Sequence, residues 1–405
     1  MISYSEALQT ILDEVITPLP SERVPLVLSL GRTVAEGIVA TEQIPAYNNS
    51  AMDGYAVLSE DTRAASQKSP ARLRVIGEAP AGAPFQGSVE PGTAVRIMTG
   101  GIVPDGANAV VEVESTEEKE DTVHVLRSVS VGSSIRLAGE DIKIGEEIIP
   151  VGKRLQPGDI GVLASLGITN VPVRIKPKVG ILATGNEVIE PHRKPEPGQL
   201  RNSNGPALYA ACVRAGAEPI DLGIAEDDRN ELLDSLETGL QYDLLLTTGG
   251  VSAGDYDLLQ TLLPELGVKV RFHKANIKPG KPVLFGLRQE GERKTLVFGL
   301  PGNPVSSLVT FQVFAVPAIT SMLGEKTEGD GMTALLEDEI TKKDNKRHFM
   351  RGVLQFSEDG NPTVSITGTQ SSGAMSSMSK ANCFILIDEE TQHVGPGEPV
   401  RVKLI

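Results

Sequence analysis

The feature that most constrains the fold is an alternation of strand-length apolar runs with helix-length amphipathic segments from Lys178 to about Leu323. Strands that alternate with helices form a parallel sheet with helices on both faces. The continuous run Leu244-Leu245-Leu246 suits a central strand that is buried on both sides. The pattern therefore predicts a doubly wound parallel α/β domain over residues 177–326. Its expected strands are 179–183, 219–222, 243–248 and 295–298, and its expected helices are 207–215, 228–240, 257–266 and 304–323.

The rest of the chain does not follow this alternation. Ser3 and Glu6 form the capping-box pattern S-x-x-E, so a helix is expected to begin the chain. A short helix near 157–166 is expected to pack with this first helix. Short alternating runs separated by Gly and Pro predict strands near 72–76, 93–97 and 122–125. The expected domains are a mixed N-terminal domain (1–45 plus 136–176), an inserted β-rich domain (46–135), the α/β domain and a C-terminal β domain (327–405).

Composition limits the possible functions. Acidic residues outnumber basic ones 53 to 38, and the formal net charge of −15 repels nucleic acid at long range, so nucleic acid is not an expected partner. Cys212 and Cys383 are too few for a thiolate metal site and are expected in the core. The first residues lack a signal-peptide pattern, and no stretch approaches 18 uninterrupted apolar residues. We therefore expect a cytoplasmic protein that does not bind a membrane.

A glycine-rich loop, residues 247–257, follows one predicted strand of the α/β domain. In open α/β sheets, ligands bind beyond the carboxyl ends of the strands. The glycines let the backbone approach a phosphate, and the loop hydroxyls can donate hydrogen bonds. A tight turn with Asp255 or Asp257 as the helix cap is the simpler explanation of this loop taken alone.

Two further loops follow predicted strands. In residues 300–306, Asn303 stands at an N-cap position and Pro304 at the first helical position, which presents unpaired N–H groups, although helix capping alone explains the pattern equally well. In residues 184–187, Glu187 could reach a metal held over the sheet edge.

Lysines and polar loops add to this set. Lys274, Lys278 and Lys281 lie within residues 273–282, where prolines stiffen the chain and could aim the ammonium groups at one anion; a solvated turn is the alternative. Residues 48–56 and 96–104 are dense in small and polar residues, for which a β-turn is the simpler explanation. No catalytic triad or zinc spacing is present, and the carboxylates, lysines and hydroxyls suit phosphate chemistry with an oxygen-liganded ion such as Mg²⁺.

Seven motifs taken together resemble the molybdopterin molybdenumtransferase family, known as MoeA in bacteria and represented in animals by the E domain of gephyrin. The resemblance spans essentially the whole chain, and an ordered set of motifs is far more specific than any one of them. The motifs are residues 49–56, 96–111, 139–141, 184–187, 247–257, 278–282 and 300–306.

The resemblance implies the final step of molybdenum cofactor synthesis. Adenylylated molybdopterin (molybdopterin-AMP) and molybdate would give the molybdenum-bearing cofactor and AMP, with Mg²⁺. The α/β domain would bind molybdopterin, the C-terminal domain would be β-barrel-like, and the mixed domain would hold a homodimer together. Asp53 and Thr99 would then reach the site from a second subunit. Molybdopterin adenylyltransferase and other proteins of the cofactor pathway are the partners that the family implies.

The resemblance also assigns roles to individual residues. Three carboxylates would handle metal and phosphate: Glu187, Asp227 and Asp255. The catalytic set that matches the family is Asp53, Thr99, Glu187, Asp227, Asp255, Lys274 and Lys278. Substrate-binding positions are Thr184, Gly185, Gly249, Gly250, Val251, Ser252, Lys281, Pro301, Gly302, Asn303, Arg351 and Ser371.

Two departures from the family pattern concern charge. Asn48 stands where many members have Asp, and Asn186 stands where Asp is frequent, so metal affinity or preference is expected to change before the reaction is lost.

Two other functions are compatible with parts of the chain. Molybdopterin adenylyl transfer needs only the α/β domain, and a non-catalytic scaffold would not need to retain Asp53, Thr99 and Glu187. The resemblance does not choose between molybdate and tungstate.

Overall fold

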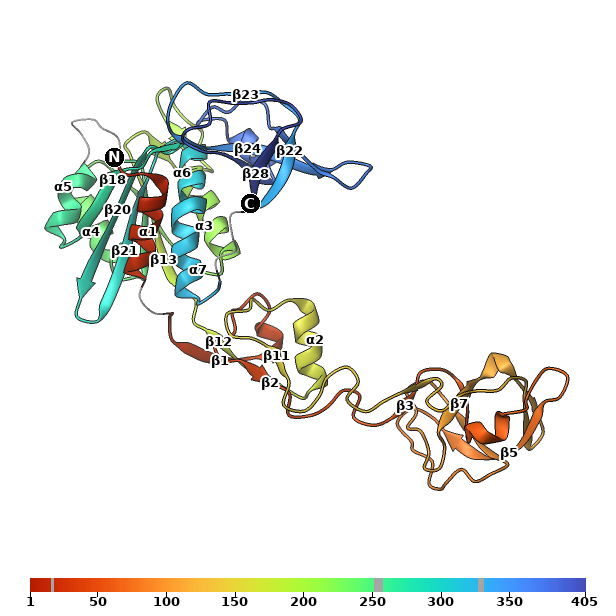
Figure 1. The fold of residues 1–405 in the computed structure, drawn as a ribbon. Coiled ribbons are helices and arrows are strands. Elements are labelled where there is room, and N and C mark those ends of the chain that lie inside the picture. The colour runs from red at the N-terminus through yellow and green to blue at the C-terminus, as the bar shows by residue number, and fades with distance from the viewer. Residues whose placement is uncertain (16–17, 251–257, 327–330) are drawn as a thin grey trace.

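The computed structural model describes residues 1–15, 18–250, 258–326 and 331–405. The molecule is elongated: the α/β domain and the C-terminal β domain lie at one end, and the inserted β-rich domain lies at the other (Figure 1). A small mixed unit connects the two ends (Figure 1). This separation decides which of the expected site residues can meet within one chain.

The α/β domain contains a six-stranded sheet with strand order β16-β13-β17-β21-β20-β18. Four of its strands run parallel, as predicted: β16 (Glu218–Ala225), β13 (Lys178–Thr184), β17 (Leu244–Thr248) and β21 (Arg293–Leu300). Leu244, Leu245 and Leu246 are fully buried in the sheet centre, as their apolar run indicates.

The sheet is not parallel throughout, which corrects the expectation. Strand β20 (Pro282–Glu290) runs antiparallel both to β21 and to β18 (Lys269–Lys274). Glu290 pairs with Arg293 across a two-residue turn that begins with Gly291 at φ +62°. A turn of this length joins antiparallel strands only, whereas parallel neighbours need a long crossover.

Helices cover both faces of this sheet. Leu232, Leu236, Leu259 and Leu262, from α4 (Arg229–Gly239) and α5 (Leu258–Glu265), pack with Leu245 on one face. The opposite face carries α3 (Asn204–Arg214), the helical segments α6 (Pro304–Thr310), η4 (Phe311–Ala315) and α7 (Val316–Met322), and α1 (Tyr4–Glu14). Cys212 on α3 is buried there, and Cys383 is buried in the C-terminal domain.

The first helix packs in a different place from the one expected. Its capping box is present, because the Ser3 side chain accepts from Glu6 N and the Glu6 side chain accepts from Ser3 N. However, the ring of Tyr4 lies 5.7 Å from that of Phe314 in the α/β domain and 5.2 Å from that of Phe349 in the C-terminal domain, in a core that the two domains share. The expectation that this helix packs with residues 157–166 is wrong. The periodicity showed that α1 has an apolar face but carried no information on which partner covers it.

The continuous helical segment Pro304–Met322 is long and apolar enough to span a membrane by length and composition. Most of it is buried inside the α/β domain, where Phe311, Val313 and Phe314 contact the sheet core. Its apolar character therefore matches that of a core helix.

The mixed unit is built from two stretches of chain that are distant in sequence. Strand β1 (Ser21–Pro25) pairs with β12 (Asn170–Arg174), and β2 (Ile38–Val39) pairs with β11 (Glu147–Ile149). Helix α2 (Pro157–Ser165) begins and ends close to the predicted positions and covers the same small core.

The inserted domain is a six-stranded sheet with strand order β7-β4-β6-β5-β9-β8. The strands predicted near 72–76, 93–97 and 122–125 are present. The strands are β4 (Gly54–Val57), β5 (Ala71–Ala79), β6 (Thr93–Ile97), β7 (Ala109–Glu112), β8 (Thr116–Lys119) and β9 (Thr122–Val125). Two short strands, β3 (Asn49–Ser50) and β10 (Ile135–Arg136), pair where the chain enters and leaves the domain.

The C-terminal domain is a closed β structure, because β24 pairs with β25 on one side and with β26 on the other. Its strands are β22 (Met332–Leu336), β24 (Arg347–Phe356), β25 (Pro362–Ile366), β26 (Cys383–Ile387) and β28 (Pro399–Leu404). A sixth strand, β19 (Ile277–Lys278), comes from the α/β domain and pairs with the start of β24. The lysine-rich loop is therefore shared between the two domains.

Candidate functional site

Three loops meet at the carboxyl ends of neighbouring strands. In the sheet register, Ala183 lies opposite Thr248, and Thr248 lies opposite Leu300. The loops that follow β13, β17 and β21 therefore start side by side. Thr184, whose hydroxyl donates to Thr248 O at 3.3 Å, is almost fully buried at this edge.

Glycine is required where these loops approach one another. Gly249 has φ +95°, and a Cβ atom there would lie 2.9 Å from Thr184 O. Gly250 also has a positive φ of +63°, and the Cα of Gly249 lies 3.7 Å from where Gly302 would carry a Cβ. The structure thus brings Gly249, Gly250 and Gly302 together at the carboxyl ends of the strands. The expected binding residues Val251 and Ser252 and the carboxylate Asp255 lie outside the described residues.

The third loop ends at the first turn of α6. Asn303 is the N-cap residue and Pro304 is the first helical residue, as the sequence predicts. The N–H of Val305 donates to Ser372 O at 3.1 Å, so the C-terminal domain occupies one of the donors of this turn. Within this loop, Gly302 faces Gly249 of the loop that follows β17.

Two carboxylates lie on adjacent loops at the same edge. Asn186 and Asp227 are joined reciprocally: Asp227 N donates to Asn186 Oδ1 at 2.9 Å, and Asn186 N donates to Asp227 Oδ2 at 3.4 Å. The Glu187 carboxylate folds back over Gly185, where a Cβ would lie 2.6 Å from Oε2. Asn186, which replaces the frequent Asp, therefore ties the two loops together.

These donors fit a hard cation. Within the described part of the chain, no group of three or more His, Cys, Asp or Glu side chains is placed to hold a metal. Glu187 and Asp227 both supply carboxylate oxygens, and Mg²⁺ is commonly held by one or two carboxylates together with substrate phosphates and water. A bound ion at this edge would therefore need further ligands from its substrate and from water.

The three expected lysines lie at the same edge of the sheet. Because Leu284 of β20 pairs with Gly299 of β21, the beginning of β20 lies beside the end of β21. Lys274 pairs with Pro282, which places Lys274 and Lys281 at this end. Lys278 forms an ion pair with Asp344 of the C-terminal domain, with 3.3 Å between Nζ and Oδ2. All three side chains are exposed to solvent.

Arg351 is buried in the C-terminal domain, only 1% exposed. Its guanidinium donates to Ser377 Oγ at 3.1 Å, Ser371 O at 3.1 Å and Thr369 O at 3.4 Å. Burial lowers the pKa of Arg351 to about 10, so the side chain is still protonated at neutral pH. The guanidinium thus holds the segment that carries Ser371, next to the residue whose carbonyl accepts from Val305 N.

Asp53 and Thr99 contact each other at the far end of the molecule. Thr99 N and Thr99 Oγ1 both donate to Asp53 Oδ1. The two bonds lower the pKa of Asp53, and the backbone bond has the larger effect. Within one chain, this pair lies in the inserted domain and is remote from the α/β loops (Figure 1). Asn48 has a structural contact nearby, since its Oδ1 accepts from Ala138 N at 2.8 Å.

The sequence analysis missed Asn204 and Asp344. The Asn204 side chain donates to Gly302 O at 2.8 Å and so supports the third loop from α3. The segment Asn202-Ser203-Asn204 consists of helix-capping residue types just before a predicted helix, and this signal could have identified it. Asp344 contacts the site only because the C-terminal domain closes over the lysine loop, so no local pattern indicates it.

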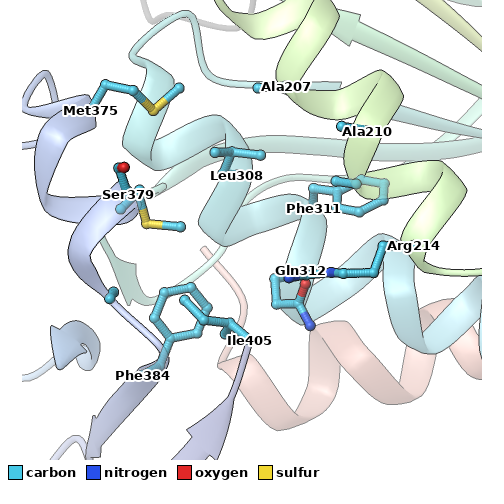
Figure 2. Close-up of a pocket in the computed structure, with 13 residues that line it drawn as sticks. Ala207, Ala210, Arg214, Leu308, Phe311, Gln312, Met375, Ser379, Phe384 and Ile405 are labelled. Carbon is cyan, nitrogen blue, oxygen red and sulfur yellow. The ribbon is translucent and has the colours of Figure 1, made fainter. Parts of the chain in front are cut away.

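An apolar pocket of about 380 Å³ lies between α3, α6, η4 and α8 (Met375–Lys380) (Figure 2). Leu308, Phe311 and Phe384 point into it (Figure 2). Of the described residues that line it, only Arg214 has a charged side chain. A phosphate-bearing ligand needs more positive charge or backbone donors than this lining offers, so the loops at the sheet edge are the better candidate site.

The fold and the loops define a multidomain α/β protein with a candidate site at the carboxyl ends of its strands. Residues 2–167 match the family model of the MoeA N-terminal region (domains I and II), residues 180–321 that of a probable molybdopterin binding domain, and residues 333–405 that of the MoeA C-terminal region (domain IV). The chain belongs to the MoeA family of molybdopterin molybdenumtransferases, enzymes of molybdenum cofactor biosynthesis.

Individual relatives are similar to this chain over nearly its full length. The molybdopterin molybdenumtransferase of Bacillus subtilis (strain 168) is 36% identical over 391 residues, which cover 95% of this chain and 90% of the relative. The molybdopterin molybdenumtransferase of Haemophilus influenzae is 34% identical over 407 residues, which cover 100% of this chain and 98% of the relative. The crystal structure of the molybdopterin biosynthesis moeA protein from Pyrococcus horikoshii OT3 has a TM-score of 0.84 and 34% identity, with 100% of both chains covered.

Proposed function

We propose that this enzyme transfers molybdate to adenylylated molybdopterin, with Mg²⁺, and releases AMP. The observation that carries the proposal is the meeting of three loops and three lysines at one sheet edge. Gly249 and Gly302 let the backbones of these loops pack closely against one another, and their N–H groups are the kind of donor that binds phosphate. Lys274, Lys278 and Lys281 supply positive charge beside these loops. No nucleophile or triad is needed for this chemistry, because positioning and charge stabilisation carry it.

Different residues of the site would bind the phosphates, the molybdate and the Mg²⁺. Asn303 and the glycine loops would orient the phosphates, and the lysines would bind molybdate. Glu187 and Asp227 would hold Mg²⁺, which when bound supplies positive charge to the two phosphates joined in the substrate. The Asn186 amide leaves this pair one charge weaker than an Asp would, so weaker Mg²⁺ binding is expected.

The proposal includes a homodimer with composite sites. Asp53 and Thr99 lie too far from the α/β loops to act on the same ligand within one chain (Figure 1). A second chain would bring its inserted domain to these loops. We further propose that the protein is soluble and cytoplasmic and that it receives its pterin from the molybdopterin adenylyltransferase that precedes it.

AMP release tests the proposal. Adenylylated molybdopterin and Mg²⁺ are incubated with and without molybdate or tungstate, and AMP is quantified for the wild type, Glu187→Gln and Lys278→Ala. Glu218→Gln and Lys269→Ala are matched controls, because β16 and β18 begin at these residues, at the opposite edge of the sheet. The proposal expects oxyanion-dependent release that only the first two substitutions abolish.

Other outcomes favour other functions. If the folded protein binds adenylylated molybdopterin but releases no AMP with either oxyanion, it is a non-catalytic binding or scaffold protein. If it instead forms adenylylated molybdopterin from molybdopterin and ATP, it is an adenylyltransferase.

A further inference from the structure

The loop that carries Lys278 is built into the C-terminal domain. Lys278 lies opposite His348 in the pairing of β19 with β24. The Asn276 side chain donates to Asn345 O at 2.7 Å, and Arg347 N donates to Asn276 O at 3.0 Å. The backbone at Lys278 is therefore held by the barrel and not by the α/β sheet alone.

Asp344 is fixed before any ligand arrives. Its Oδ1 accepts from His348 Nε2 at 2.8 Å and from Lys346 N at 3.2 Å, while Oδ2 faces Lys278 Nζ at 3.3 Å and Lys346 Nζ at 3.9 Å. The His348 side chain is only 9% exposed, so its ring has little freedom. Burial alone would raise the pKa of Asp344, but the hydrogen bond and charge of His348, with Lys346 N and Lys278, bring it to about 2. The carboxylate is ionised at neutral pH.

Lys278 keeps donors available for a ligand. Its side chain is 57% exposed, and within the described residues Asp344 is the one partner of its ammonium group. Lys342, two residues before Asp344 in the sequence, differs: its ammonium donates to the carbonyls of Lys346, Asp388 and Glu389 and has no donor left for an anion.

We propose that Asp344 is a positioning residue that orders the Lys278 ammonium at the rim of the site for binding of a tetrahedral oxyanion. The inference rests on the proposed function of the site. A free lysine loses rotamer freedom when it binds an anion, and a fixed carboxylate removes part of that freedom beforehand. One ammonium proton then faces Asp344, and the other two remain for the ligand.

The alternative is that Asp344 repels the oxyanion and competes for Lys278, and two substitutions distinguish these roles. Asp344→Ala removes the acceptor and the charge, whereas Asp344→Asn removes the charge and keeps an oxygen. Positioning predicts that Ala weakens oxyanion binding and that Asn weakens it less. Competition predicts tighter binding in both variants. Asp388→Asn is the matched control, since Asp388 pairs with Arg347 in the same domain without contacting Lys278.

Two measurements on the full chain carry the test. The dissociation constant for molybdate and its apparent KM are each expected to rise about two- to fivefold in Asp344→Ala, the range that an exposed ion pair supports, with kcat unchanged. Labelling of Lys278 by an amine reagent, followed by peptide mass spectrometry, should be faster in Asp344→Ala than in wild type and should be slowed by molybdate. Thermal unfolding establishes that each variant is folded.

The outcomes separate the inference from the proposed function. Equal labelling of Lys278 in wild type and Asp344→Ala, or molybdate binding that is unchanged or tighter in the variant, overturns the positioning role alone. Absence of molybdate protection at Lys278 in the wild type overturns the oxyanion site, and the positioning role with it.

Discussion

Thr99 donates two hydrogen bonds to a single oxygen of Asp53, with its backbone N–H and its hydroxyl each 2.7 Å from Oδ1. Charge-assisted bonds of this length fix the carboxylate and keep it ionised. The pair nevertheless lies in the inserted domain, while the phosphate-binding loops lie at the other end of the molecule (Figure 1). An ionised carboxylate held in this way could act on a ligand at those loops only from another chain, as the proposed homodimer would allow.

Mixed dimers test the proposal that the site is shared between two chains. We expect Asp53→Asn and Lys278→Ala each to inactivate the proposed homodimer. A heterodimer of the two variants then holds one site with both substitutions and one site with neither. Co-purification through two different affinity tags and an AMP-release assay should therefore recover about half of the wild-type activity per dimer, because one of two sites is intact.

Sites contained within single chains give a different result for the mixed dimer. Each chain would then carry one inactivating substitution, and the heterodimer would be as inactive as either parent. A heterodimer of Asp53→Asn with wild type, which keeps one intact site under either arrangement, is the control for assembly.

The inserted domain should lose stability in acid through one ion pair. Arg127 binds Glu112 with two bonds, 2.8 Å to Oε1 and 2.6 Å to Oε2, and this bidentate contact lowers the pKa of Glu112 to about 2. A carboxylate whose folded pKa is depressed stabilises the fold above its unfolded pKa, and the contribution is lost as pH falls towards 2. Calorimetry should show that Glu112→Gln destabilises the domain by about 1 kcal/mol at pH 7, since Arg127 is half exposed, and much less at pH 3.

Glu117→Gln is the comparison for that measurement. Glu117 pairs with Lys119 through a longer contact of 3.5 Å, with both side chains more than half exposed, so its replacement should change stability little at either pH. A Glu112→Gln effect that is as large at pH 3 as at pH 7 would show that the lost contact is not electrostatic.

The order of elements could be read from the sequence because each has a local signature. Strand β6 and helix α2 begin where the sequence predicts, and the buried run of β17 marks the sheet centre. Strands β18 and β20 were not predicted, because the expected pattern was strands alternating with helices; the short turn at Gly291 makes β20 antiparallel to β21. Helix α1 was assigned to the wrong neighbour because an apolar face does not specify its partner.

Some residues of the candidate site could be located from the sequence and others could not. The glycines, lysines and Asn303 lie in short motifs, so the resemblance located them and the structure places them at one sheet edge. Asn204 and Asp344 depend on contacts across 98 and 66 positions of sequence, to Gly302 and Lys278 respectively. Contacts of that separation leave no pattern in a single sequence.

Gly280 should be irreplaceable in the lysine loop. It has φ +97°, and a Cβ there would lie 2.4 Å from Thr310 Cγ2. We expect Gly280→Ala to destabilise the protein by about 2 kcal/mol, through backbone strain and a clash with a buried helix, and to weaken molybdate binding. Adding Thr310→Ser removes the clashing methyl group and keeps the hydroxyl, so the double variant should recover part of the loss.

Gly291→Ala is the control that separates the effect of backbone strain from the effect of the steric clash in Gly280→Ala. Gly291 also has a positive φ, +62°, but a Cβ there would meet nothing within 4 Å. Its replacement should cost about 1 kcal/mol and leave molybdate binding unchanged. Equal effects of the two alanines on molybdate binding would contradict the assignment of this loop to the site.

Arg351 should act through the segment that it holds. A lysine at this position keeps the charge but not the planar fork that reaches Ser371 O and Ser377 Oγ together. We expect Arg351→Lys to destabilise the protein by about 1–3 kcal/mol, because partly buried carbonyls and the buried Ser377 hydroxyl lose their donor. Hydrogen exchange at residues 369–372 should accelerate, and oxyanion-dependent AMP release should fall because this segment also contacts Val305 at the start of α6.

The comparison with Ser377→Ala decides whether Arg351 works by support or by direct contact with the ligand. Ser377 accepts from Arg351 Nε and is 1% exposed, so its replacement loosens the guanidinium without removing it. If Arg351 acts through support, Ser377→Ala should give a smaller version of the same changes in exchange and activity. The double variant should then fall short of the sum, because both substitutions remove one shared bond. A loss of molybdate binding in Arg351→Lys with unchanged exchange at 369–372 would instead show that the guanidinium contacts the oxyanion itself.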